Sequence, residues 1–172
     1  RTGESNSENG QLVAQQYIKK PKGYINNDDL HECLTENGVN ETIDELQEQN
    51  ESKEVGGLVS VVKIGEEEYI KIDYYIGIDS HTMWSFAGLP PEDFEVDENG
   101  RLVGFIHSHP VHEGKKDSFQ FSGGDAYCFW SIFNKRYRWM SNGYGKISSN
   151  SFFMSVRTPK CTQYLQLINY KV

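Results

Sequence analysis

The segment best suited to chemistry reads GFIHSHP, from Gly104 to Pro110, and it places two histidines one residue apart after an apolar run. Side chains at positions i and i+2 of a strand face the same way, so His107 and His109 can reach one ion while Ser108 points elsewhere. Proline cannot donate to the strand ladder, and Pro110 therefore leaves the imidazoles at an open edge. Zinc in hydrolases is held by three His or carboxylate ligands with one position left for water, which makes this pair a candidate for two of the three.

A third ligand is offered by the sequence FSGGD at residues 121–125. If a helix begins there, Asp125 in its first turn can return a carboxylate to the two imidazoles. Ordinary helix chemistry explains the same residues, because Ser122 is a favoured N-cap and an acid in the first turn faces the positive end of the helix dipole. Caps are far commoner than metal ligands, so this segment alone does not decide between the two interpretations.

Glu54 adds a further element, because it stands immediately before a β-branched run that begins with two glycines. The segments Glu54–Leu58, His107–Pro110 and Phe121–Asp125 then follow one another in the order found in the JAMM metalloprotease family, also called JAB or MPN-plus. The chain resembles this family over about residues 40–135, and the expected element types agree as well. Each segment alone is unspecific, whereas the ordered set is a fairly specific signal.

The resemblance implies a zinc-dependent metallopeptidase or isopeptidase that hydrolyses an amide bond in a protein or peptide substrate. By the same resemblance, His107, His109 and Asp125 bind Zn²⁺. Glu54 holds the bound water and carries its proton to the leaving amine, which is a plausible role for a carboxylate beside zinc. Ser122 helps to stabilise the oxyanion of the tetrahedral intermediate, as a hydroxyl donor near developing negative charge can do.

The chain departs from the family pattern in the spacer at residues 111–121, whose eleven residues are more than the family members usually have. An outward loop would accommodate them at little cost, or Asp117 would take the third ligand position instead; a fixed aromatic platform favours Asp125. The longer spacer and the short strand-turn-strand end are more similar to bacterial JAB-like domains of Rhs and other polymorphic toxins. That subfamily implies an inhibitor or immunity protein, and a C-terminal domain of a larger exported protein.

The elements that must position these residues suggest a mixed α/β layer fold, in which helices flank a mixed β-sheet. The resemblance implies the layered fold that JAMM proteins share with cytidine deaminases. Residues 1–23 are expected to be disordered or loosely attached, since 1–10 hold no large apolar residue, and residues 24–172 to form one JAMM-like catalytic domain. The expected strands are 56–64, 69–78, 102–106, 151–156 and 163–170, with a loop at 79–93.

Three helices are expected around these strands. A short one ends near Gly38, and a second runs from Asn40 to about Asn50 with Asn40 as its N-cap and a capping box formed by Thr42 and Glu45. The third begins after Ser122, where apolar residues recur at helical spacing.

Composition and net charge limit the classes of binding partner that this chain is expected to have. The chain has 172 residues, 37% of them hydrophobic, which is enough for one core. A net charge of −8 argues against nucleic acid and anionic membranes as main partners. The three scattered cysteines do not form a disulfide framework, and no apolar run reaches the roughly 20 residues that span a bilayer. We therefore expect a soluble protein. The resemblance, not the composition, implies that it acts on a protein or peptide, and oligomeric state is not predicted.

Two other functions stay open at this point. A catalytically inactive JAMM-like fold would serve as a binding module or scaffold, although such members usually lack a ligand and none is missing here. A different zinc-assisted hydrolysis or a deamination is the weaker alternative. Deaminases use a His-x-Glu signature followed by paired cysteines, whereas His112 and Glu113 are adjacent and no C-x-x-C follows.

Overall fold

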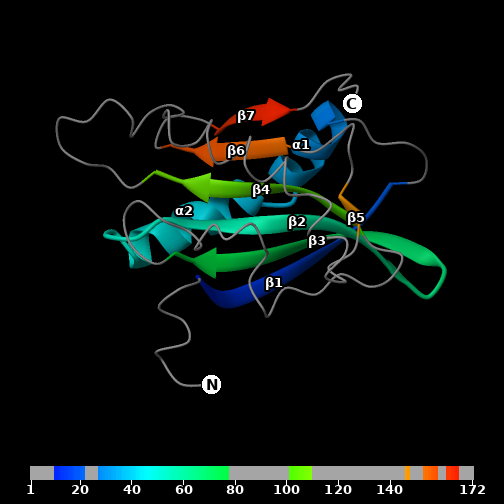
Figure 1. The fold of residues 1–172 in the computed structure, drawn as a ribbon, viewed down its shortest axis with the longest axis horizontal. Helices are drawn as coiled ribbons and strands as arrows, with labels where there is room; N and C mark the ends of the chain where they lie inside the picture. The colour runs from blue at the N-terminus through cyan, green and yellow to red at the C-terminus, as the bar shows by residue number, and fades with distance from the viewer. Residues whose placement is uncertain are drawn as a thin grey trace.

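A computed structural model of the chain describes residues 10–21, 27–77, 101–109, 146–147, 153–158 and 162–166. The expected loop at 79–93 and the expected helix after Ser122 lie outside these residues. The described part is an α/β structure in which two helices pack on one face of a mixed sheet (Figure 1). Within it, none of the helices is both long and apolar enough to cross a membrane.

The described residues form a sheet of seven strands, and six of them follow the order β1-β3-β2-β4-β6-β7. Their bounds are β1 Gln11–Lys19, β2 Val55–Ile64, β3 Glu67–Ile76, β4 Arg101–Ser108, β5 Lys146–Ile147, β6 Phe153–Arg157 and β7 Thr162–Gln166. β4 is antiparallel to β2 and parallel to β6, and the short β5 pairs with the start of β4. This change of direction at β4 makes the sheet mixed.

The centre of the sheet forms for the reason that the sequence suggested. β2 is rich in β-branched residues and its first eight residues are buried, as expected for a strand covered on both faces. β3 adds aromatic residues, and six of its ten residues are buried. They are joined by a tight turn in which Ile64 pairs with Glu67. Gly65 in this turn has φ +64°, a left-handed conformation that glycine adopts without steric cost.

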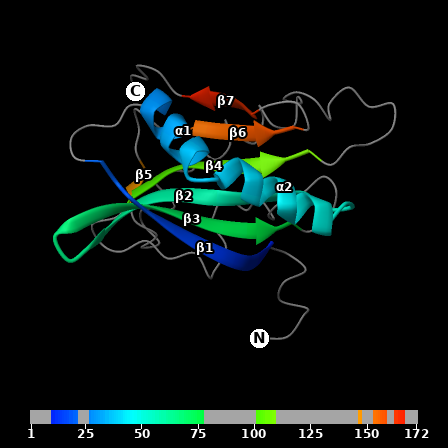
Figure 2. The same cartoon turned by 180° about the vertical axis from the view of Figure 1, so that it is seen from behind.

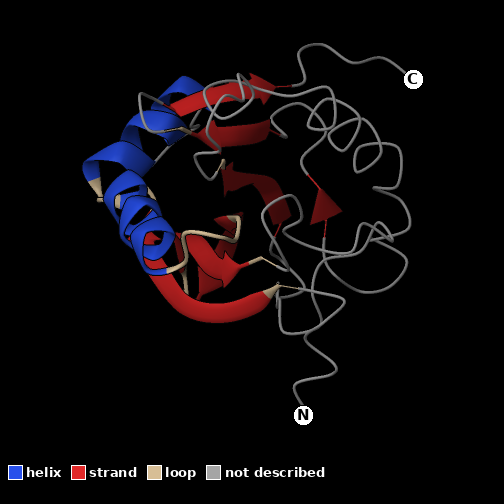
Figure 3. Cartoon of the chain, turned by 90° about the vertical axis from the view of Figure 1, so that its left-hand side faces the viewer, coloured by secondary structure: helices blue, strands red, loops and turns tan. Residues whose placement is uncertain are grey.

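Both described helices lie on the same face of the sheet, as Figure 2 and Figure 3 show from two directions. They are α1, Asn27–Glu36, and α2, Val39–Gln49. Their apolar residues join those of the strands in one core, to which the helices contribute Leu30, Leu34, Val39 and Ile43 and the sheet contributes Ile18, Val55, Val59, Val61, Ile70, Ile72, Tyr74, Val103, Ile106 and Phe153. Along β2 and β3, alternate residues thus face the helices, and the residues between them face the opposite side of the sheet. In β4 a register shift at Val103 interrupts the alternation, and beyond it Ile106 faces the helices.

The start of α2 corrects one expectation. Its N-cap is Gly38, with φ +76° and no side-chain capping bond, so the predicted cap at Asn40 is wrong. Thr42 also departs from the expected capping box, because its hydroxyl donates to the carbonyl of Gly38 at 3.0 Å. The helix begins earlier because Val39 is 1% exposed and anchors the first turn in the core. Burial of an apolar side chain outweighs a favourable cap of about 1 kcal/mol.

The strand β1 corrects a second expectation, which concerns the N-terminal segment. Of the segment 1–23 that was expected to be loosely attached, residues 11–19 form a strand paired along β3 from Gln11↔Ile76 to Lys19↔Tyr69. The strand lies at the end of the described strand order and is mostly exposed, with Ile18 as its buried residue. The segment was not predicted as a strand because its glutamines interrupt the alternation of apolar and polar residues. A strand at the end of the described order needs little apolar surface.

Candidate functional site

The two histidines of the motif lie at the end of β4, on the face of the sheet opposite to α1 and α2. His107 is 4% and His109 9% exposed. Their ring centroids are 5.0 Å apart, at an interplanar angle of 62°. Two imidazoles on one tetrahedral zinc ion, with Zn–N bonds of about 2.0–2.1 Å, would place their ring centroids roughly 5 Å apart. The spacing of the two rings therefore fits a shared ion.

Glu54 reaches the same end of the sheet from the neighbouring strand. Gly56 pairs with His107 across β2 and β4, and Glu54, two residues earlier, belongs to the same face. Its carbonyl accepts a hydrogen bond from Gly77 N at 2.7 Å, which extends the β2–β3 ladder beyond the strand. Continuing the β2–β4 register by two residues brings Glu54 to the level of His109. The Glu54 residue as a whole is 8% exposed and is therefore largely shielded from water.

Gly56 is needed for this close approach. A Cβ atom at that position would lie 2.0 Å from the carbonyl oxygen of Ile106 and 2.9 Å from the Cα of His107. Any side chain there would push β2 away from β4 at the level of the first imidazole. The first glycine after Glu54 thus has a steric explanation in the spacing of the two strands.

Ser108, between the two histidines, points to the helix-covered face. Its hydroxyl accepts a hydrogen bond from Val55 N at 3.0 Å and donates a short one to Gln47 Oε1 of α2. The predicted direction of Ser108, away from the imidazoles, is confirmed; the role of Gln47 was not predicted. Nothing in the local sequence marks Gln47, which is one of several polar residues on α2.

A second set of contacts fixes the other side of β4. Arg157 of β6 accepts, through its carbonyl, a hydrogen bond from His109 N at 3.2 Å. The Arg157 guanidinium binds both carboxylate oxygens of Asp44 on α2, at 3.0 and 2.9 Å. The backbone at His109 is therefore tied to β6, and β6 is tied to the same helix that contacts Ser108.

A buried ion pair lies farther along the imidazole-bearing face. Lys71 Nζ is 3.5 Å from Asp73 Oδ2, and these side chains are 6% and 0% exposed. Gln15 of β1 donates to the other oxygen, Asp73 Oδ1, at 2.6 Å. Leu58 and Phe105 occupy the positions beside Asp73 on the next two strands. A row of apolar side chains therefore continues from this ion pair across the sheet, and Phe105 reaches the histidines, its ring centroid being 6.2 Å from that of His107.

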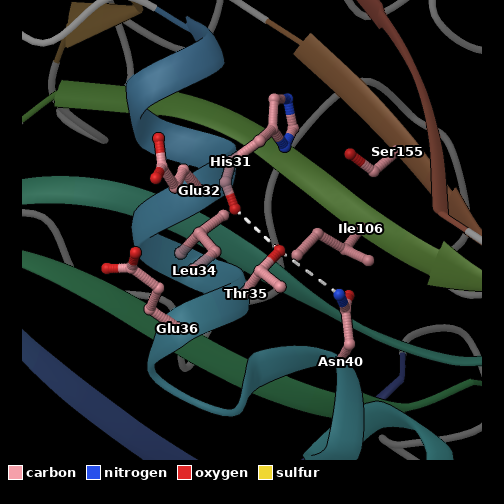
Figure 4. Close-up of a pocket in the computed structure, with 8 residues that line it drawn as sticks. All are labelled: His31, Glu32, Leu34, Thr35, Glu36, Asn40, Ile106 and Ser155. Atoms are coloured by element: carbon pink, nitrogen blue, oxygen red, sulfur yellow. Dashed lines mark hydrogen bonds between the residues drawn. The ribbon is translucent and has the colours of Figure 1, made fainter.

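A pocket of about 270 Å³ lies between α1 and the sheet. Figure 4 shows the imidazole of His31 and the hydroxyl of Ser155 on its sheet side, with Thr35 and Asn40 along the helices. Ile106, which pairs with Ser155, also lines it. Ile106 faces the helices and His107 faces away, so this pocket and the imidazole pair lie on opposite faces of the sheet.

Three of the predicted site residues are described: the rings of His107 and His109 lie close together, and Glu54 lies on the side of the neighbouring strand at the same end of the sheet. The other two, Ser122 and Asp125, lie outside the described residues, as does Asp117. Among the residues that are described, no three or more His, Cys, Asp or Glu side chains gather closely enough to hold a metal ion. A metal ion bound by the two imidazoles would need at least one more ligand from outside the described residues.

The site thus contains two neighbouring imidazoles, from His107 and His109, and the side chain of Glu54. All three residues are buried at one end of the sheet. Neutral imidazole is a common zinc ligand, and a carboxylate nearby can take up and release a proton. Comparison of the chain with models of protein families, with curated protein sequences and with solved structures found no match.

Proposed function

We propose that this chain is a zinc-dependent hydrolase of the JAMM type that cleaves an amide bond in a protein or peptide substrate. One observation carries the proposal: His107 and His109 are buried at a strand end with ring centroids 5.0 Å apart, and Glu54 belongs to the same face of the adjoining strand. The ordered motifs of the sequence support the same function, as do the mixed sheet and its flanking helices. The finer assignments, a JAMM-like layered fold and a polymorphic-toxin domain, are part of this proposal.

In the proposed site, His107, His109 and Asp125 hold the zinc ion. When bound, zinc supplies a Lewis acid that polarises the scissile carbonyl and lowers the pKa of water. Glu54 accepts a proton from the attacking water and delivers it to the leaving amine, for which a carboxylate shielded from bulk water is suited. Ser122 donates a hydrogen bond to the oxyanion of the tetrahedral intermediate.

Metal analysis tests the site first. Protein purified without chelators and dialysed against Zn²⁺ is expected to retain one zinc ion per chain, measured by inductively coupled plasma mass spectrometry. Asp125→Ala should lose the ion, whereas Asp117→Ala should keep it and serves as the matched control. Loss in Asp117→Ala with retention in Asp125→Ala would move the third ligand to the longer spacer. A wild-type chain that retains no zinc contradicts the proposal.

Hydrolysis tests the function. The probe is a library of peptides derived from whole-cell protein, supplemented with peptides joined through a lysine isopeptide bond, and new ends are identified by mass spectrometry. Glu54→Gln should keep its zinc and lose cleavage, because an amide cannot accept the proton. Zinc bound at full occupancy without cleavage of any probe would favour the binding or scaffold module. Cleavage that persists unchanged in Glu54→Gln would refute the assigned mechanism.

A further inference from the structure

The hydroxyl of Ser108 joins three elements at the candidate site. It belongs to β4, it accepts the Val55 N–H of β2, and it donates to Gln47 of α2. Ser108 is 2% exposed, so water does not readily replace either bond. A buried hydrogen bond whose partner is removed leaves an unsatisfied group, at a cost of about 1–3 kcal/mol.

Gln47 extends this link to the segment that precedes Glu54. Its amide nitrogen donates to the carbonyl of Asn50 at 2.9 Å and to the carbonyl of Lys53 at 2.8 Å. Gln47 therefore holds the turn between α2 and β2 while its oxygen accepts the Ser108 hydroxyl. The residues on both sides of Glu54 are fixed: the Lys53 carbonyl by Gln47 and the Val55 amide by Ser108.

We propose that Ser108 and Gln47 are positioning residues that set the direction of the Glu54 carboxylate relative to the two imidazoles. The inference rests on the proposed function and assigns to it two residues that touch neither ion nor substrate. A residue fixed at both flanking peptide groups has little backbone freedom, so the Cα–Cβ bond of Glu54 keeps one direction and limits where the carboxylate can lie. Misplacement of a reacting group by about 1 Å can reduce a rate roughly a hundredfold, which gives such a constraint functional weight.

The imidazoles themselves depend less on this link. His109 N is bonded to the Arg157 carbonyl, and His107 lies between Gly56 and Val156 in the sheet. Removal of the Ser108 hydroxyl should therefore leave the histidine pair in place and loosen the peptide group after Glu54, which then keeps only the bond from Gly77 N to its carbonyl. A positioning role therefore predicts a change at Glu54 with the histidine pair intact, whereas a general loss of stability would affect both.

Cobalt provides the test, because bound Co²⁺ has visible absorption bands that respond to the groups around the ion. Spectra at one neutral pH are recorded for wild type and for Glu54→Gln, which defines the spectrum of a site without the carboxylate. Ser108→Ala and Gln47→Met should still bind Co²⁺, with bands shifted toward those of Glu54→Gln. Ser108→Thr keeps the hydroxyl and should restore the wild-type spectrum.

Asp44→Asn is the matched control, because it breaks a different contact between α2 and the sheet, the Asp44–Arg157 pair. It should lower stability and leave the cobalt bands unchanged. Gln47→Met changes a half-buried helix position and should therefore fold more readily than a variant at the buried Ser108. If Ser108→Ala does not fold, Gln47→Met still tests the same hydrogen-bonded link. Wild-type bands in both Ser108→Ala and Gln47→Met would overturn the positioning role and leave the proposed function standing. A wild-type chain that binds no Co²⁺, or a Glu54→Gln spectrum equal to that of wild type, would overturn both.

Discussion

Gly56 and His107 face each other across β2 and β4, and the strands approach so closely that a Cβ on Gly56 would lie 2.0 Å from the Ile106 carbonyl oxygen. No side-chain rotation relieves a contact between a Cβ and backbone. Gly56→Ala is therefore expected to lower the free energy of unfolding by about 3 kcal/mol, at the upper end of overpacking costs. Urea denaturation followed by circular dichroism measures the change.

Gly65→Ala is the control for that substitution. Gly65 has φ +64°, but no atom lies within 4 Å of a Cβ built there. The variant is strained only through its backbone, which costs about 1–2 kcal/mol. Equal losses in the two variants would contradict the steric argument for Gly56.

The buried ion pair should behave unlike a surface pair. Asp73→Ala leaves the Lys71 ammonium without its carboxylate in a buried site, and we expect a loss of about 3–5 kcal/mol in the free energy of unfolding. Replacing both residues, as in Lys71→Met with Asp73→Leu, should recover most of this loss because no isolated charge remains. Denaturant unfolding of the single and double variants provides the comparison.

Lys19 and Glu67 give the surface reference. Their charged groups are 2.9 Å apart, yet both side chains are at least half exposed. Exposed pairs contribute little, so Glu67→Ala should unfold at nearly the wild-type urea concentration. For the buried pair, the contradicting outcome is a double variant, Lys71→Met with Asp73→Leu, that is no more stable than Asp73→Ala. Packing, not charge, would then dominate the loss of stability at this pair.

Tyr74 predicts how stability changes at alkaline pH. Its phenol donates to Gln16 Oε1 at 2.6 Å, and burial raises the pKa of Tyr74 to about 12. A tyrosine of the unfolded chain ionises near pH 10. The stabilising contribution is therefore complete below pH 10 and is lost as the pH rises through about 12.

Wild type should accordingly lose stability between pH 10 and 12 more steeply than Tyr74→Phe, which has no phenol to ionise. The variant should be less stable than wild type at pH 8 by about 1 kcal/mol, the usual value of one hydrogen bond. Urea midpoints at a series of pH values measure both effects. Parallel curves for the two proteins would show that Tyr74 does not cause the alkaline loss.

Zinc should stabilise the fold if His107 and His109 bind it. Zn²⁺ at about 100 times its dissociation constant adds about 2.7 kcal/mol to the free energy of unfolding, because only the native state presents the site. The melting temperature should fall on addition of EDTA and recover with Zn²⁺. His109→Ala should abolish the zinc-dependent increment, whereas His31→Ala, in the pocket on the other face, should retain it.

Sequence reasoning succeeded where burial dominates the local pattern. β2, β3 and β4 were recognised from their β-branched and aromatic runs, and α2 from its apolar stripe. It failed at β1, whose glutamines pair with β3 through backbone bonds that any residue type can make. It also failed at the start of α2, where the burial of Val39 decides the boundary and Gly38 replaces the expected cap.

The candidate site was predictable in part for similar reasons. The i, i+2 spacing of His107 and His109 is enough to place both on one face of β4. Glu54 required the register between β2 and β4, which no local pattern contains. The Ser108–Gln47 link could not be predicted, because it joins residues far apart in the chain through side chains that are common on any polar surface.

β4 has an antiparallel neighbour on one side and a parallel neighbour on the other. The β2–β3 hairpin closes over a tight turn, whereas the pairing of β4 with β6 requires a distant part of the polypeptide to return. Long loop closures slow folding, since their entropy is lost before any contact compensates. We therefore expect the hairpin that follows Glu54 to form before the imidazoles acquire β6 as their second neighbour.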